Sequence, residues 1–286
     1  MAYQLISASA AVDTSVDPKS VLATMDRCSV DAAVVVPLPV ECGVADANDR
    51  LVSFCATDPE RLWGVAQLPS SGLAEAVAEA RRMAEAPTVA GLLLAAWPNG
   101  SLEIEPEDDQ LWELASAAGL PLVIRGGLGA RALDWRPPSR LEDAVTFADV
   151  PGRQVQLLFG GVLQRFTRLQ FVMAAADCGW VPYFEYLAND NYLRHSRATL
   201  RDRPLPDLPG RMFSGHVSYT MTSDPFAVTN RDRIGVHRMQ WSIDLGPDTS
   251  LKEVTESLSE LAPLGREERH AIVAANALRI YRHPGR

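Results

Sequence analysis

The sequence predicts an α/β fold, a (β/α)8 TIM barrel made by one domain over residues 1–286. Short runs rich in Val, Ile and Leu alternate with amphipathic stretches along the whole chain, and there are eight such runs. Eight strands separated by helices favour a parallel barrel over an open doubly wound sheet, which usually has fewer strands. The composition, 47% hydrophobic and 22% charged, supplies the apolar side chains for a substantial core.

Each expected strand is a short aliphatic run followed by residues typical of turns. The strands are expected at Gln4 to Ala8, Ala32 to Pro37, Leu62 to Leu68, Val89 to Ala95, Pro121 to Ile124, Leu169 to Ala174, Val217 to Met221 and Met239 to Ile243. Helical spacing of apolar residues marks Pro18 to Cys28, Ala45 to Thr57, Leu73 to Ala84, Asp108 to Ala118, Leu141 to Phe166 in two pieces, Val181 to Arg194 and Leu251 to Leu261. A last helix, Glu267 to Tyr281, is expected to pack outside the barrel.

Two stretches rich in Pro, Arg or Gly, Gly126 to Arg140 and Arg201 to Arg211, are predicted to be long loops. Loops at strand ends are where barrel enzymes build their substrate pockets. The glycines at 126, 127 and 129 leave backbone N–H groups accessible beside Arg125, which suits an anion site and equally suits a flexible loop.

The charge of the chain argues against nucleic acid as a partner. The formal net charge is −9 and the pI is about 5.1, whereas phosphate binding needs clustered cations. Of the 27 basic residues 25 are Arg, and both lysines, Lys19 and Lys252, lie in polar helical stretches away from strand ends. A Schiff-base mechanism is therefore not expected.

The expected cellular compartment and the expected lack of a membrane role are based on three motifs that the sequence lacks. The four cysteines show no C-x-x-C spacing, and no apolar run reaches the roughly 18 residues that a transmembrane helix needs. No signal-peptide pattern opens the chain. We therefore expect a cytoplasmic protein with reduced thiols and no membrane role.

Several motifs, in order along nearly the full chain, resemble the decarboxylase-like branch of the amidohydrolase superfamily, typified by aminocarboxymuconate semialdehyde decarboxylase. They are Asn48-Asp49-Arg50 with Asp58-Pro59-Glu60-Arg61-Leu62-Trp63-Gly64, Gly160-Gly161-Val162-Leu163-Gln164-Arg165-Phe166, Gly179-Trp180-Val181-Pro182-Tyr183 and Asn276-Ala277-Leu278-Arg279-Ile280-Tyr281. The resemblance implies the barrel fold and a divalent metal held by histidines at the strand ends.

This sequence lacks most of the metal ligands that the resemblance implies. The D-x-H or H-x-H element of the first strand is matched by Ser9-Ala10-Ala11, and the histidine after the fifth strand by Arg125. The sixth-strand ligand falls at Ala175 and the last histidine at Pro247, so only the aspartate, Asp244, remains. A guanidinium has no lone pair for a metal, and we therefore expect no metal and no other cofactor.

Two residues are the predicted catalytic pair. Asp244 follows the run Met239 to Ile243 and is expected to act as general acid/base, while Arg125 would replace the charge of the metal and bind an anion. The alternative is a structural ion pair between the two side chains in an inert barrel.

Five further residues are candidate substrate contacts, and two of them, His216 and Asp177, have a structural alternative. Strand alternation turns His216, Thr220 and Thr222 inward with Asp244, although His216 also fits a core histidine low on its strand. Asp177 is a candidate second carboxylate or a solvated loop acid, and Trp97 a wall of the barrel mouth.

Three function classes remain open from the sequence. The first is a metal-independent hydrolase of a lactone or similar small carboxylated ring, since the superfamily includes lactone hydrolases that work without a metal. The second is a lyase or cyclase using the same pair of residues, and the third is a pseudoenzyme or binding protein. The expected partner is a small-molecule substrate, and the resemblance also implies a homodimer.

Overall fold

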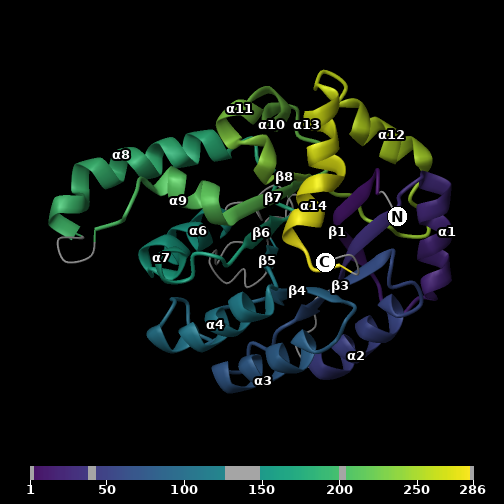
Figure 1. The fold of residues 1–286 in the computed structure, drawn as a ribbon, viewed down its shortest axis with the longest axis horizontal. Helices are drawn as coiled ribbons and strands as arrows, with labels where there is room; N and C mark the ends of the chain where they lie inside the picture. Colours follow the sequence, from purple (N-terminus) through teal and green to yellow (C-terminus); the bar gives the residue numbers. More distant parts are fainter. Residues whose placement is uncertain (1–2, 38–42, 126–148, 200–203, 284–286) are drawn as a thin grey trace, which may run out of the picture.

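The structure, a computed structural model, describes residues 3–37, 43–125, 149–199 and 204–283. Eight parallel strands form one sheet in the order β1 to β8, so the barrel expected from the sequence is confirmed (Figure 1). The strands are β1 (Ile6–Val12), β2 (Ala32–Pro37), β3 (Leu62–Gln67), β4 (Val89–Leu94), β5 (Leu122–Arg125), β6 (Phe171–Ala174), β7 (Val217–Met221) and β8 (Met239–Trp241).

Helices follow the strands and surround the barrel (Figure 1). They are α1 (Pro18–Cys28), α2 (Val44–Cys55), α3 (Leu73–Ala84), α4 (Asp109–Ala118), α6 (Asp149–Phe159), α7 (Val162–Arg165), α8 (Val181–Thr199), α9 (Pro209–His216), α10 (Pro225–Thr229), α11 (Arg231–Ile234), α12 (Leu251–Ser259), α13 (Arg266–His270) and α14 (Asn276–Ile280). Short 3-10 segments cover Pro106–Asp108 and Val236–Arg238, and a π-helical segment, Ala271–Ala275, joins α13 to α14.

Local sequence signals explain where these helices begin and end. At α1, the Asp17 side chain accepts the N–H of Lys19, and Pro18 occupies the first turn, where its missing N–H costs nothing. Ser250 and Glu253 form a capping box at the start of α12. Gly119 ends α4 with a φ of 64°, a conformation that glycine adopts without strain.

The seam between the last strand and the first depends on a side chain. The Ser7 hydroxyl donates to the carbonyl of Ile243 at 2.8 Å and accepts its N–H at 2.9 Å. Ser7 is completely buried, so these bonds are shielded from water. This hydroxyl joins β1 to the segment that follows β8.

Side-chain alternation along the last strands agrees with the expected orientation. The Trp241 indole donates to Ser257 of α12, and the Tyr219 hydroxyl donates to Gln154 of α6, so both rings face the outer helices. Strand geometry then turns Thr220 and Gln240, which are paired in register, toward the barrel interior.

The C-terminal segment covers the end of the barrel where the strands begin. Asn276 donates to the carbonyls of Val236 and Met239 at the start of β8. Arg282 donates to the carbonyl of Val89 and to two carbonyls just before β4. The expected outer helix is therefore present, and it leaves the opposite end, where the strands finish, to the connecting loops.

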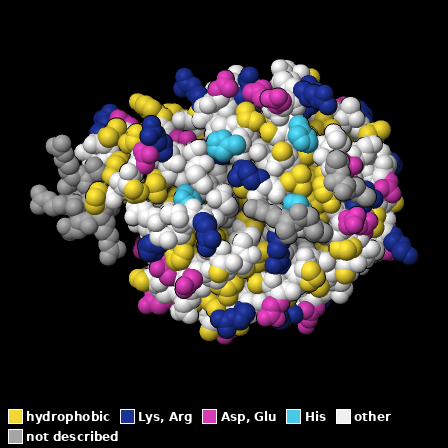
Figure 2. Space-filling view, viewed as in Figure 1, with side chains coloured by type: hydrophobic (Ala, Val, Ile, Leu, Met, Phe, Trp, Pro, Cys, Tyr) yellow, Lys and Arg dark blue, Asp and Glu magenta, His cyan; other side chains and the backbone are white. Residues whose placement is uncertain are grey.

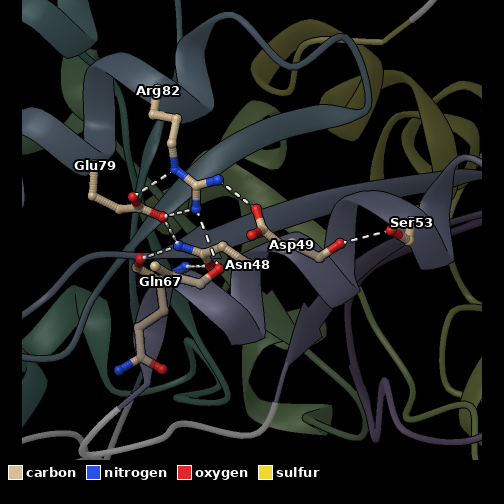
Figure 3. A network of polar contacts seen from close by, with 7 residues as sticks. Asn48, Asp49, Ser53, Gln67, Glu79 and Arg82 are labelled. Atoms are coloured by element: carbon tan, nitrogen blue, oxygen red, sulfur yellow. Dashed lines mark hydrogen bonds and ion pairs between the residues drawn. The ribbon is translucent and has the colours of Figure 1, made fainter.

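A polar network, buried at Asn48 and exposed at Arg82, fastens the end of β3 to the helices beside it (Figure 3). Asn48 of α2 donates to the carbonyl of Gln67 at 2.9 Å and accepts its N–H at 3.0 Å. The same amide donates to Glu79 of α3, and Arg82 bridges Glu79 and Asp49. This part of the family-like motif thus has a structural role.

One expected feature differs in the structure. Residues 209–211, expected within a loop, begin α9, because Pro209 is acceptable in the first turn of a helix. The expected loop from Gly126 to Arg140 lies outside the described residues.

Within the described part of the chain, no helix is long and apolar enough to cross a membrane. Cationic and anionic side chains are interspersed over the face shown in Figure 2.

Candidate functional site

Asp244 lies just beyond the C-terminal end of β8, exposed to solvent. Its carboxylate oxygen Oδ1 accepts the backbone N–H of Ala11 on β1 at 2.9 Å. Its own carbonyl accepts the hydroxyl of Thr249, which closes the turn that follows. The side chain is thereby oriented while its second oxygen remains available to a ligand.

Arg125 is the last residue of β5 and is half-buried. It is paired in register with Ala174, the last residue of β6. The ion pairs found among the described residues do not include one between Arg125 and Asp244. The structural alternative considered from the sequence, an ion pair between these two side chains, is therefore not formed.

Asp177 lies in the loop after β6 and is exposed. The surrounding loops desolvate its carboxylate, and the nearby negative charge of Asp224 adds to this effect, so the pKa of Asp177 rises to about 6. A hydrogen bond with the backbone of Thr222 opposes this rise. Thr222 itself is exposed just beyond β7, on the same side of the barrel.

Thr220 is a buried residue of β7 whose hydroxyl accepts the N–H of Ala175 at 3.0 Å. This bond fixes the start of the loop that carries Asp177. Thr220 therefore supports the loop, whereas Thr222 is open to solvent near the same loop. The structure thus brings Asp177, Thr220 and Thr222 together.

Two candidates lie away from this group of residues. His216 ends α9 before β7 begins, and its Nδ1 is 3.0 Å from the carbonyl of Leu169, so it lies at the opposite end of the barrel from Asp244. Trp97 is 1% exposed, and its indole donates to Gln156 of α6 beneath the guanidinium of Arg153. His216 matches the core alternative, whereas Trp97 packs against α6 and also borders a small pocket with Ile124 and Arg153.

Two further polar residues, which were not among the predicted site residues, lie near this group. Asp224 is 7% exposed and accepts the N–H groups of Cys178 and Gly179. The sequence Ser223-Asp224-Pro225, an acceptor followed by proline, is a helix-start signal that could have identified it. The Gln240 amide is fully buried inside the barrel, and neither its oxygen nor its nitrogen has a hydrogen-bond partner.

Cys178 is buried beside this loop with its sulfur 3.8 Å from that of Met221. Burial, together with the negative charges of Asp224 and Asp177, raises the pKa of its thiol well above the ordinary value. A thiol held in its neutral form is a poor nucleophile, and the site therefore does not suit cysteine catalysis.

A surface cavity of about 390 Å³ opens between the loop after β1 and helix α2. Its lining consists of Thr14, Val16, Pro18, Asp49, Arg50, Ser53 and Phe54. None of these is a predicted site residue. The predicted residues Arg125, Asp177 and Asp244 lie elsewhere, at or just beyond the ends of β5, β6 and β8.

A parallel eight-stranded barrel with polar side chains at the C-terminal strand ends defines an enzyme-like architecture. The chain belongs to the amidohydrolase family, whose model matches residues 2–283. No curated protein matches it in sequence. The resemblance noted in the sequence is thus confirmed at the level of the family.

Solved structures with the same fold are distant in sequence. 5-carboxyvanillate decarboxylase from Sphingomonas paucimobilis has a TM-score of 0.77 and 17% identity, covering 99% of this chain and 100% of that one. 2,6-dihydroxybenzoate decarboxylase from Rhizobium has a TM-score of 0.73 and 16% identity, and the match covers 98% of each chain. A manganese-bound dihydroxybenzoic acid decarboxylase from a Polaromonas species has a TM-score of 0.74 and 16% identity, and the match covers 98% of this chain and 97% of that one.

The residues at the family's metal positions do not fit a divalent cation. Ala11, Ala175 and Pro247 offer no side-chain ligand, and Arg125 carries a permanent positive charge. In the described part of the chain, no group of three or more His, Cys, Asp or Glu side chains is placed to hold a metal ion. One carboxylate, that of Asp244, falls short of the three or four ligands that such sites use.

Proposed function

We propose that this protein is a metal-independent enzyme that acts on a small carboxylated substrate at the C-terminal ends of β5 to β8. Asp244 serves as the general acid/base, and Arg125 binds the anionic group of the substrate or stabilises charge that develops during the reaction. The observation that carries the proposal is the retained, oriented carboxylate of Asp244 among positions that have lost their metal ligands.

The position of Asp244 supports a role in proton transfer. Its contact with Ala11 joins it to the strand position that holds a histidine in the family, so the carboxylate is oriented by backbone instead of by a metal. An exposed, oriented carboxylate at a strand end can reach a substrate proton, which a residue in the barrel wall cannot.

Arg125 supports the choice of an anionic substrate. A guanidinium with no ion pair among the described residues, half-buried at the end of β5, has donors free for a bidentate contact with a carboxylate. It also supplies positive charge where the family has a metal, although it cannot activate water as a metal does. A reaction that needs only charge stabilisation and proton transfer fits this arrangement.

Decarboxylation is the second candidate reaction, and the similar solved structures favour it. They are decarboxylases of aromatic acids, which suggests a hydroxylated or carboxylated ring as substrate. In this reaction the bond to the carboxyl group breaks, CO2 leaves, and the ring carbon takes a proton from the enzyme. In lactone hydrolysis, the first candidate, water adds to the carbonyl and the ring C–O bond breaks.

A panel of carboxylated lactones and hydroxybenzoic acids tests the proposal and separates the two reactions, with CO2 release and ring opening measured in parallel. Asp244→Asn keeps the volume of the side chain and removes the base, so we expect kcat to fall by about 100-fold or more with unchanged folding. Asp248→Asn, an exposed acid four residues further on, is the matched control.

Arg125→Lys keeps the charge and loses the bidentate geometry, so we expect it mainly to raise KM. Full turnover by Asp244→Asn would assign the chemistry to another residue. Failure of the wild-type protein to bind or convert any member of the panel would instead support a binding protein or pseudoenzyme.

A further inference from the structure

The loop that follows β6 contains two non-glycine residues in the left-handed region of backbone conformation. Ala175 has a φ of 53° and Asp177 a φ of 49°. This conformation costs an L-residue roughly 1–2 kcal/mol, and alanine has no side chain that could offset the cost. Such residues persist only where the surrounding structure holds them, and they are concentrated at functional sites.

A buried acid holds this loop in place. Oδ2 of Asp224 accepts the N–H of Cys178 at 2.8 Å and that of Gly179 at 2.7 Å, while Oδ1 accepts the N–H of Ala227 at 2.9 Å. A Cβ atom on Gly179 would lie 2.7 Å from Oδ1 of Asp224, so only glycine permits this approach. Together with the bond from Ala175 to Thr220, these contacts fix the loop on both sides of Asp177.

The fixed loop presents the Asp177 carboxylate at the same end of the barrel as Asp244. β7 lies between β6 and β8, so two neighbouring strand spacings, about 10 Å in all, separate the strands that the two acids follow. Arg125 ends β5, the strand next to β6, and is paired in register with Ala174.

We propose that Asp177 is a second catalytic carboxylate, the proton donor that acts on the substrate across the barrel mouth from Asp244. The inference rests on the function proposed above and extends it. In decarboxylation, CO2 leaves, its bonding electrons remain on the ring carbon, and that carbon takes the proton of Asp177. In lactone hydrolysis, Asp244 takes a proton from the attacking water, and Asp177 gives one to the departing alkoxide oxygen.

The electrostatic surroundings of Asp177 suit this role. The charged groups that face it are Asp224, from the segment between β7 and α10, and Glu260, which follows α12. Both disfavour the ionised form of Asp177, and desolvation by the loops acts in the same direction, so its pKa is about 6. An acid whose pKa lies near neutral pH is suited to proton donation.

Kinetics against pH test the assignment on the panel substrate that the wild-type protein converts. The acid must be protonated, so kcat of the wild type should decline as pH rises above about 6. Asp177→Asn should lower kcat by about 100-fold and remove the decline of kcat with pH. Asp177→Glu, which keeps a carboxyl group, should retain part of the kcat and part of its decline with pH. Asp232→Asn, an exposed acid on α11, is the control and should behave as the wild type.

A binding measurement gives a second readout that does not depend on turnover. The probe is 2,6-dihydroxybenzoate, titrated by calorimetry at pH 7 in two buffers with different ionisation enthalpies. An anion bound beside Asp177 raises the pKa of that carboxyl further, so the wild type should take up a proton on binding and Asp177→Asn should take up none.

The outcomes separate the two proposals. Equal proton uptake and equal pH profiles in the wild type and Asp177→Asn overturn the role of Asp177 and leave Asp244 and Arg125 as proposed. Absence of both turnover and binding in the wild type overturns the proposed function, and this inference with it.

Discussion

Asn48 uses its side-chain amide to bond both backbone groups of Gln67, at 2.9 and 3.0 Å, and so joins α2 to the end of β3 (Figure 3). Asn48 is fully buried, so its replacement by alanine would remove both hydrogen bonds at a place where water cannot substitute for the lost amide. We expect Asn48→Ala to lower the free energy of unfolding by about 3 kcal/mol, measured by urea denaturation. Ser53→Ala, on the exposed side of the same helix, should change it by less than about 0.5 kcal/mol.

The buried ion pair between Arg238 and Glu185 gives a second prediction. The atoms are 2.8 Å apart, and the guanidinium also donates to the carbonyls of Val217 and Ile234. Glu185→Gln leaves this buried positive charge uncompensated, so we expect a loss of about 3 kcal/mol in unfolding free energy. The exposed pair on the same helix is the control: Asp190→Asn should cost less than about 0.5 kcal/mol. Equal losses in the two variants would contradict the assignment.

The raised pKa of Asp177 predicts a pH-dependent stability. Its value is about 6 in the folded protein against an ordinary 3.8, so the folded state binds the proton more tightly. The stability that this proton contributes is complete below pH ~4 and is lost as pH rises through 6.

Asp177→Asn removes this loss. At pH 8 the variant should be more stable than the wild type by about 1 kcal/mol, a value reduced to allow for the solvent exposure of the side chain. At pH 4 the two proteins should unfold at the same temperature in scanning calorimetry. A stability difference that does not change with pH would show that the substitution acts through packing.

Treatment with a chelator should leave the protein unaffected. Since Asp244 is the only family ligand that remains, a divalent cation lacks the donors it needs for stable binding. We expect well under one equivalent of zinc or manganese by elemental analysis, and unchanged melting temperature and turnover after dialysis against EDTA. One tightly bound equivalent would require ligands other than those of the family site.

The sequence predicted the barrel because its signals are local. The strands Ala32–Pro37 and Val217–Met221 and the helix Pro18–Cys28 have the predicted bounds, since aliphatic runs, turn residues and a proline in the first helical turn are readable from neighbouring positions. Helix α9 was missed because its proline-rich approach is also typical of loops.

The candidate site depended on contacts between distant segments and was predicted less completely. Alternation correctly turned Thr220 toward the barrel interior, because it is a property of one strand. It could not show that Trp97 packs against α6, or that Asp224 fixes the loop of Asp177, because each contact joins segments that are far apart in the chain. Roles for Asp244, Arg125 and Asp177, and the expected homodimer, stay predictions.

The Ser7 hydroxyl bonds a residue 236 positions away, so its partner is among the last parts of the barrel to be synthesised. Until that segment emerges from the ribosome, the first strand can pair with β2, but the Ser7 hydroxyl lacks this partner and the shielding that the finished interior provides. Local contacts can form earlier, but the ring closes only when both ends of the chain are present. The Asp244 carboxylate accepts an N–H of that same first strand, so it too can be oriented only after both ends of the chain are present.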